Sequence, residues 1–270
     1  MKNALRLMLC LAPAAAAGLL LSPMAMAADA WGNNDSQFLL GGGIAAGPRY
    51  SGASENTVAP VILLDYSHTS GFFASTMRGL GYGGQQGPLS YSAALSYRGG
   101  RKEKNEHALF GNTGSTQLHG MGDIKGNASA VLNLGYKPFS MLELNLGADI
   151  PLSQRDNGKN VHAGISGQLL EAGNDKLTLG ASAGFADSKY AQTYYGVTAK
   201  QAATSKFKAY QAGSGLYEVN AMLSWEHRID KQWSVTSMLG ANHLLKAAAR
   251  SPLTQRKTSP TGAVYVSYAY

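Results

Sequence analysis

The chain has 270 residues, and only 14% of them are charged, against about 25% in a typical soluble domain. Its formal charge is 23 minus 16, or +7, and 44% of its residues are hydrophobic. The single cysteine, Cys10, excludes an intrachain disulfide, and beyond residue 27 no apolar run is long enough for a membrane-spanning helix.

The first 27 residues predict a cleaved signal peptide. Lys2 and Arg6 form a basic start, the stretch 7–21 is apolar, and 25–27 carries small residues at the two positions that a signal peptidase reads. A membrane anchor is the alternative, but the run is short for a span of about 20 residues. We therefore expect two parts: a signal peptide at 1–27 and one exported domain, without cysteine, at 28–270.

Period-two alternation dominates the exported part and predicts β-strands. In 142–150, apolar residues from Leu142 to Ile150 alternate with small or polar ones from Glu143 to Asp149. The pattern predicts eleven strands, at 36–46, 58–67, 71–81, 88–98, 123–136, 140–151, 160–171, 176–186, 214–227, 233–245 and 261–270.

The links between these strands alternate in length. Short links at 82–87, 137–139, 172–175 and 228–232 fall at one end, and the long stretches 99–122, 187–213 and 246–260 fall at the other. Short periplasmic turns and long external loops are typical of bacterial membrane barrels. Such barrels have an even number of strands. The conflict lies before residue 82, or one of the long loops hides a strand. Either 36–46 does not span, which gives ten strands, or a strand is missed, which gives twelve, the number we favour.

The second face of each strand separates two architectures. A soluble sandwich presents Lys, Glu and Thr to water, whereas this face is mostly Gly, Ser, Asn and Ala, which suit a crowded barrel interior. Aromatic residues recur near strand ends, where a membrane barrel has its girdles: Tyr66, Tyr82, Tyr97, Tyr136, Trp225, Trp233 and Tyr270. The sequence predicts an all-β fold, a single antiparallel transmembrane barrel of ten to twelve strands.

The chain ends in an amphipathic strand. Val264, Val266, Tyr268 and Tyr270 share one face of it. A C-terminal strand that closes on an aromatic residue resembles the signal by which outer-membrane barrels are recognised and inserted. We therefore expect Tyr268 and Tyr270 to be read by the barrel-assembly machinery.

A series of short motifs spans nearly the whole exported part. They are GPRYSG at 47–52, PVILLDY at 60–66, LSYRGGR at 95–101, GMGDI at 120–124, ADSKYAQTYYGVTAKQA at 186–202 and RSPLTQ at 250–255. In order and spacing the series resembles the MipA/OmpV family, named for the MltA-interacting protein.

The resemblance implies a non-enzymatic protein of the outer membrane. The founding role in that family is a scaffold that links a lytic transglycosylase and a bifunctional murein synthase in cell-wall assembly. Other members are discussed as adhesins or stress-responsive proteins, so family membership fixes location better than task. A small-solute channel is the other alternative, and an adhesin would use the tyrosine-rich loop with Tyr190, Tyr194, Tyr195 and Tyr210.

We expect no catalytic, cofactor or metal site. His162 with Ser166 and His243 with Ser237 could be drawn as hydrolase pairs, but serine is so frequent that such pairs arise by chance. His107 and His119 match no metal-ligand spacing. Glycine-rich stretches such as 41–43 precede no helix of a βαβ unit and are better explained as strand glycines.

Basic residues gather in the three long loops. We expect an external rim that meets the phosphates of lipopolysaccharide, formed by Arg98, Arg101, Lys102, Lys104, Lys206, Lys208, Arg250, Arg256 and Lys257. Generic solvated loop charge explains the same residues equally well. Export removes nucleic acid as a partner.

Four carboxylates are predicted to point into the barrel, namely Glu143, Asp149, Glu218 and Glu226. Buried carboxylates need partners, and Arg98, Lys176 and Arg228 are candidates. Such pairs would narrow or plug a small barrel, whose interior side chains can fill.

Overall fold

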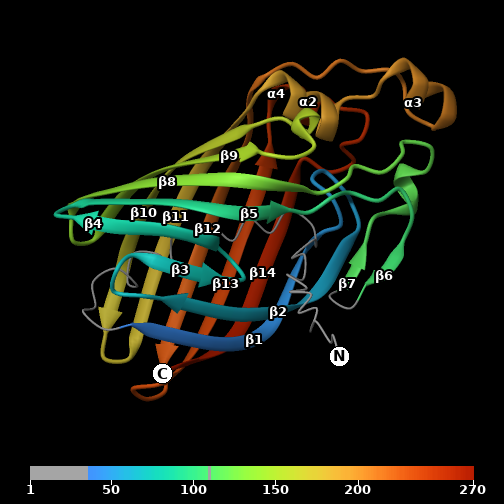
Figure 1. The fold of residues 1–270 in the computed structure, drawn as a ribbon. Helices are drawn as coiled ribbons and strands as arrows, with labels where there is room; N and C mark the ends of the chain where they lie inside the picture. Colours follow the sequence, from blue (N-terminus) through green and yellow to red (C-terminus); the bar gives the residue numbers. More distant parts are fainter. Residues whose placement is uncertain (1–35, 109–110) are drawn as a thin grey trace, which may run out of the picture.

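The computed structural model describes residues 36–108 and 111–270, so the predicted signal peptide at 1–27 lies outside it. Twelve antiparallel strands close into one barrel (Figure 1). They are β1 (Gln37–Pro48), β2 (Asn56–Ser67), β3 (Phe72–Ser75), β4 (Gly79–Gln86), β5 (Leu89–Arg98), β8 (Asn127–Phe139), β9 (Leu142–Pro151), β10 (Asn160–Ala172), β11 (Asp175–Ala186), β12 (Gly215–Arg228), β13 (Trp233–Leu244) and β14 (Thr258–Ala269). The first and last strands pair from Leu39↔Ala269 to Ala46↔Gly262, which closes the barrel.

Twelve strands confirm the favoured number, and the extra strand is β4, which also covers most of 82–87, so the short link expected there is wrong. The single strand expected at 71–81 is wrong: it is the hairpin β3–β4, which turns at 76–78. The Ser75 hydroxyl accepts hydrogen bonds from the backbone N–H groups of Met77 (3.1 Å) and Arg78 (3.2 Å), and Gly79 takes a positive φ of 87°. Outward residues are even-numbered on both sides of this turn, so the alternation passes through it unchanged.

The outer surface of the barrel is apolar. Each of the twelve barrel strands exposes at least one large hydrophobic side chain on its outward face. Where the chain ends, aromatic rings pack side by side: the centroids of Phe38 and Tyr270 lie 5.6 Å apart, and those of Trp233 and Tyr268 lie 5.0 Å apart. An outward apolar belt bordered by aromatic residues is the surface of a barrel that spans a membrane.

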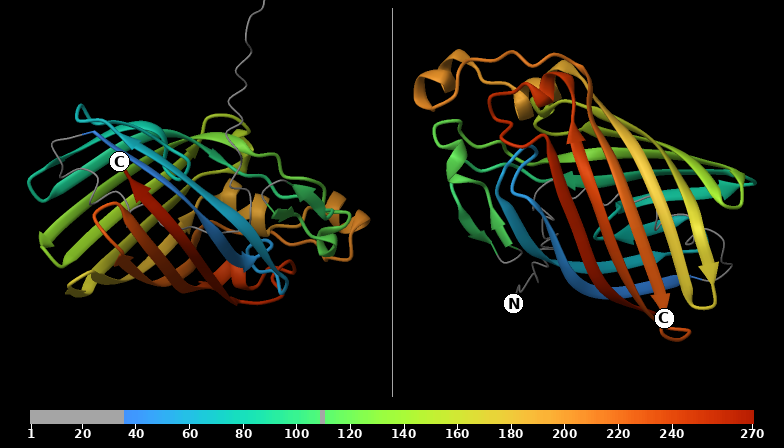
Figure 2. Two further views of the ribbon diagram at one scale, coloured as in Figure 1. Left: turned by 90° about the horizontal axis from the view of Figure 1, so that it is seen from below. Right: turned by 180° about the vertical axis from the view of Figure 1, so that it is seen from behind.

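The two ends of the barrel differ as the sequence predicts. Short turns lie at the end that carries the C-terminus, at 68–71, 87–88, 140–141, 173–174 and 229–232. The longer loops and all the helices gather at the opposite end (Figure 2). By the rule of short periplasmic turns, that end is external. None of the helices among the described residues is long and apolar enough to cross a membrane.

The interior has two unlike halves. Strands β1, β2, β13 and β14 contribute a buried apolar cluster of Ala45, Leu63, Met238, Ala263 and Tyr265. Strands β8 to β12 instead line the lumen with small and polar residues, among them Asn133, Asn145, Ser166 and Asn220, all half-buried. The polar half fits a barrel interior, whereas the apolar half resembles the core of a soluble protein.

Candidate functional site

The external mouth is covered by a cap, made of the loops 49–55, 99–126, 187–214 and 245–257. Helices α2 (Ser188–Tyr195), α3 (Ala199–Thr204) and α4 (Lys246–Ala249) belong to it (Figure 1). Two buried clusters hold the cap together. The first is Tyr50, Ala53, Leu118, Met121, Val197, Phe207 and Leu253, and the second is Ala186, Ala191, Tyr195, Ala212, Tyr217, Leu244 and Ala248. The loops thus pack like a small domain rather than extend into solvent.

Local sequence signals start the cap helices. Asp187 accepts a hydrogen bond from the N–H of Tyr190 (2.7 Å) at the beginning of α2. Thr198 and Gln201 form a capping box at α3. Ser51 and Tyr195 share a hydroxyl–hydroxyl bond of 2.8 Å, which joins two loops far apart in the chain. Caps therefore fix the helices, and side-chain bonds fix the loops to one another.

Arg101 fastens the cap from within. Its residue is 8% exposed, and its Nη1 donates to the Tyr194 carbonyl (2.9 Å) in the last turn of α2. A cation at a helix C-terminus stabilises the unpaired carbonyl groups there. Burial lowers the pKa of Arg101 and raises the pKa of the neighbouring Tyr50 to about 12. None of the ion pairs among the described residues includes Arg101.

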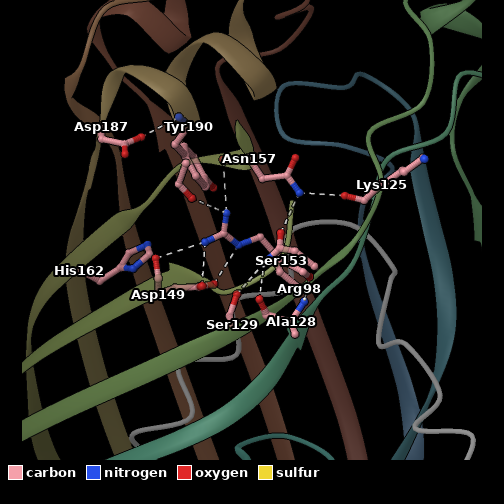
Figure 3. A network of polar contacts seen from close by, with 12 residues as sticks. Arg98, Lys125, Ala128, Ser129, Asp149, Ser153, Asn157, His162, Asp187 and Tyr190 are labelled. Atoms are coloured by element: carbon pink, nitrogen blue, oxygen red, sulfur yellow. Dashed lines mark hydrogen bonds and ion pairs between the residues drawn. The ribbon is translucent and has the colours of Figure 1, made fainter. Parts of the chain in front are cut away.

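Arg98 is the centre of a polar network beneath the cap (Figure 3). Its Nε lies 2.9 Å from Oδ2 of Asp149, and its Nη2 lies 2.7 Å from Oδ1. Its Nη1 donates to the Gly158 carbonyl (2.9 Å), and its guanidinium lies 5.3 Å from the ring centroid of Tyr190. The bidentate ion pair connects β5 to β9 and places the cation under α2. Arg98 was among the predicted partners of the lumen carboxylates, and this pairing is confirmed.

A second network surrounds Glu218, whose side chain is 3% exposed. Nε2 of His162 lies 3.4 Å from its Oε1 and 3.1 Å from the Tyr217 hydroxyl. Asn242 donates to the other carboxylate oxygen. A carboxylate this deeply buried is stable only with such partners. The network joins β10, β12 and β13 directly under the second cap cluster.

Interior charges occur lower in the barrel as well. Nε of Arg78 donates to Asp65 (3.0 Å), and its guanidinium lies 4.4 Å from the Phe73 ring centroid. The pair was missed from the sequence. Asp65 lies on the inward face of β2, as Leu63 does. The alternation therefore placed this carboxylate inside the barrel, where a buried charge needs a cationic partner.

The histidines considered as catalytic contact other residues than the serines with which the sequence analysis paired them. His162 contacts Tyr217 and Glu218, and Nδ1 of His243 lies 2.7 Å from the Thr258 hydroxyl. In the described part of the chain, no three His, Cys, Asp or Glu side chains gather as metal ligands would. The side chain of His107 is not among those that the structure describes.

The expected basic rim is only partly external. Arg98 lies in the lumen and Arg101 inside the cap, so the external position expected for both residues is wrong. Lys102 pairs with Asp123 at 2.9 Å, and Arg256 is half-buried beside Asn56. The remaining cations are exposed on the cap, namely Lys104, Lys206, Lys208, Arg250 and Lys257.

The tyrosine-rich loop faces inward. Tyr195 is buried, and Tyr190 and Tyr194 pack against the second cap cluster. The ring centroids of Tyr190 and Tyr217 lie 5.3 Å apart. The rings of Tyr190, Tyr194 and Tyr195 thus pack within the cap rather than form an exposed surface. Tyr210 is partly exposed, and an adhesin role for this loop stays a prediction.

Comparisons with known proteins give a family and a set of similar barrels. The family model described as MltA-interacting protein MipA matches residues 40–270. No curated protein compared with the chain matches it. The NanC porin is 10% identical, with 86% of this chain and 98% of that chain covered and a TM-score of 0.45. An outer membrane channel from Pseudomonas putida F1 is 10% identical, with 88% and 95% covered and a TM-score of 0.45. At these values the likeness says nothing about a ligand.

Proposed function

Because the chain belongs to the MltA-interacting protein MipA family, we propose that it is a non-enzymatic scaffold that brings a lytic transglycosylase and a bifunctional murein synthase together. It is an outer-membrane β-barrel. The observation that supports the proposal is the cap, whose loops pack over the external end of the barrel through two buried apolar clusters. A barrel closed on the outside offers its periplasmic end and its membrane-facing wall to partners.

The periplasmic turns supply a small contact surface. Phe139 is the last residue of β8, Met141 lies in the β8–β9 turn and Ile229 lies in the β12–β13 turn. All three residues are more than half exposed. Exposed apolar side chains beside polar turns favour protein contact. We propose the N-terminal segment, from about Ala28 to Gln37, as the rest of the surface; its residues 28–35 lie outside the described part of the chain.

The test is retention of purified periplasmic transglycosylase and synthase domains on the detergent-solubilised barrel. Met141→Lys is expected to reduce retention, because a charge replaces an apolar contact at the proposed surface. Leu152→Lys is the matched control: Leu152 lies just beyond the other end of β9, is also exposed, and should leave retention unchanged. No retention of the unaltered protein at low salt would refute the proposal.

A small-solute channel is the second candidate, and the polar half of the lumen favours it. Side chains there are half-buried rather than packed, as in Asn133 and Asn145. Solute could pass through the polar half of the lumen only if the cap moved away from the external mouth. Conductance recordings in planar bilayers distinguish the two candidates, because steady open steps favour the channel.

A further inference from the structure

The cap carries a cleft on its solvent-exposed side. The cleft has a volume of about 730 Å³ and lies between the 3₁₀ helix η2 (Arg155–Asn157), helix α2 and the segments 197–198 and 209–212. This volume is within the range of roughly 300–1,000 Å³ that is typical of small-molecule sites. Neither Arg98 nor Glu218 lines the cleft, so it is distinct from the two polar networks beneath the cap.

The floor of the cleft is apolar. Val197 and Ala212 line it and are 2% and 3% exposed, and Tyr210 beside them is half-buried. The backbone groups of Val197 and Tyr210 exchange two hydrogen bonds, of 2.8 and 2.9 Å. The Tyr210 hydroxyl donates to the Ala247 carbonyl (2.9 Å), so the ring rather than the hydroxyl is left for a ligand. Because these bonds lie within the protein, the floor is formed without a ligand, which lowers the cost of binding.

The edge of the cleft is polar. Ser188 and Gln211 line it and are exposed, and neither side chain hydrogen-bonds to another residue in the part of the chain that the structure describes. Nζ of Lys189 lies 2.8 Å from Oδ1 of Asp156, and this contact uses one of three ammonium donors and one of two carboxylate oxygens. Hydroxyl, amide, ammonium and carboxylate groups with free bonding capacity therefore surround the apolar floor.

The cleft lies directly above the membrane-facing belt. Val161 near the external start of β10 and Phe185 near the external end of β11 belong to this belt and are 38% and 45% exposed. Asp187, two residues beyond Phe185, is the N-cap of α2, and its N–H donates to the Lys159 carbonyl (3.0 Å). The outer leaflet of an outer membrane carries lipopolysaccharide, whose sugars lie above the acyl chains. The cleft is therefore at the depth of these sugars.

We propose that the cleft binds an oligosaccharide, namely the core oligosaccharide of a neighbouring lipopolysaccharide molecule. A sugar ring has hydroxyl groups at its edge, which pair with the polar groups around the cleft, and an apolar C–H face, which packs on Val197 and Tyr210. An anionic ligand fits less well, because the only charged residues that line the cleft are Asp156 and Lys189, whose charges cancel. An apolar ligand would cover the polar edge without pairing it. The proposal is independent of the phosphate contacts expected at the exposed cap cations.

The test is isothermal titration calorimetry of dephosphorylated core oligosaccharide with the folded barrel in detergent. Removing the phosphates from the probe excludes the exposed cap cations as the cause of binding. Ala209→Trp places a large ring in the cleft from an exposed position and should abolish measurable binding. Ala203→Trp is the matched control: Ala203 is exposed on α3, does not line the cleft, and should leave binding unchanged.

If Ala209→Trp fails to fold, the double variant Ser188→Ala with Gln211→Ala gives the same test. It removes both unpaired edge groups without breaking an internal hydrogen bond, and should weaken binding about tenfold. The absence of binding by the unaltered protein would overturn the proposal. Equal binding by Ala209→Trp and Ala203→Trp, both migrating as folded barrels before heating, would overturn it too. Maltotriose tests the source of the sugar: if it binds as tightly as the core oligosaccharide, the assignment to lipopolysaccharide is wrong.

Discussion

Replacing Arg98 with methionine removes the cation from the centre of the polar network under the cap. Its side chain is 13% exposed, and that of Asp149 is 24% exposed. The change leaves the Asp149 carboxylate without its guanidinium partner and the Gly158 carbonyl without a donor. Methionine keeps much of the side-chain volume, so lost charge and hydrogen bonds dominate the effect.

Breaking a buried ion pair by removing one partner costs roughly 3–5 kcal/mol. Asp149 remains a quarter exposed, and water that reaches it reduces this penalty to about 2–3 kcal/mol. The assay is urea unfolding of the refolded barrel in detergent micelles, followed by the gel shift between compact and heat-denatured forms. Lys189→Met is the control, because it removes the cation of an exposed pair with Asp156 at the same end of the barrel.

Equal stability losses in Arg98→Met and Lys189→Met would refute the reasoning, since Arg98 is buried and makes more hydrogen bonds than Lys189. A double variant, Arg98→Met with Asp149→Leu, should recover more than half of the lost stability, because it removes the stranded carboxylate. If the double variant is less stable than the single one, the penalty does not arise from the unpaired charge.

Three further outcomes are expected. Tyr50 stays protonated in the folded cap because burial raises its pKa from 10.0 to about 12, whereas the unfolded phenol ionises near 10.0. The stability that the neutral Tyr50 contributes to the cap is therefore fully present below pH 10.0 and is lost between pH 10.0 and about 12. Tyr50→Phe cannot ionise, so proteolysis of its cap should begin at a higher pH than in the unaltered protein. The same pH dependence of proteolysis in both proteins would contradict this assignment. Deleting Tyr270, whose backbone N–H donates to Phe38 (2.9 Å), should lower the heat-modifiable fraction in outer membranes through poorer insertion, and a normal yield contradicts this. Reversing the exposed cap charges should weaken binding to isolated lipopolysaccharide, with Arg98 left intact as an internal control; unchanged binding removes the rim hypothesis for Lys104, Lys206 and Lys208.

Most of the barrel could be predicted from the sequence because alternation is a local property. The inward and outward faces of 142–150 follow from adjacent residues, and β9 has those faces. The lengths of the links between strands predicted which end of the barrel is external. The β3–β4 turn escaped because its position keeps the outward residues even-numbered on both sides, so no break in phase marked it.

The candidate site was harder to predict because it depends on contacts between distant segments. Arg98 is the last residue of β5 and shares the inward face with Ser96, so alternation made it a candidate partner for the lumen carboxylates, of which it pairs with Asp149. Arg101 lies three residues further on, in a loop whose burial is set by 49–55 and 187–214. Loop packing of this kind leaves no periodic signal, so a buried arginine was expected at the surface.

The closed external mouth is tested most directly by single-channel recording of the unaltered protein in planar bilayers. With the two cap clusters packed over the lumen, the expected trace shows no steady open steps at moderate voltage. Stable, reproducible conductance steps from correctly folded protein would contradict the account and make the barrel a channel.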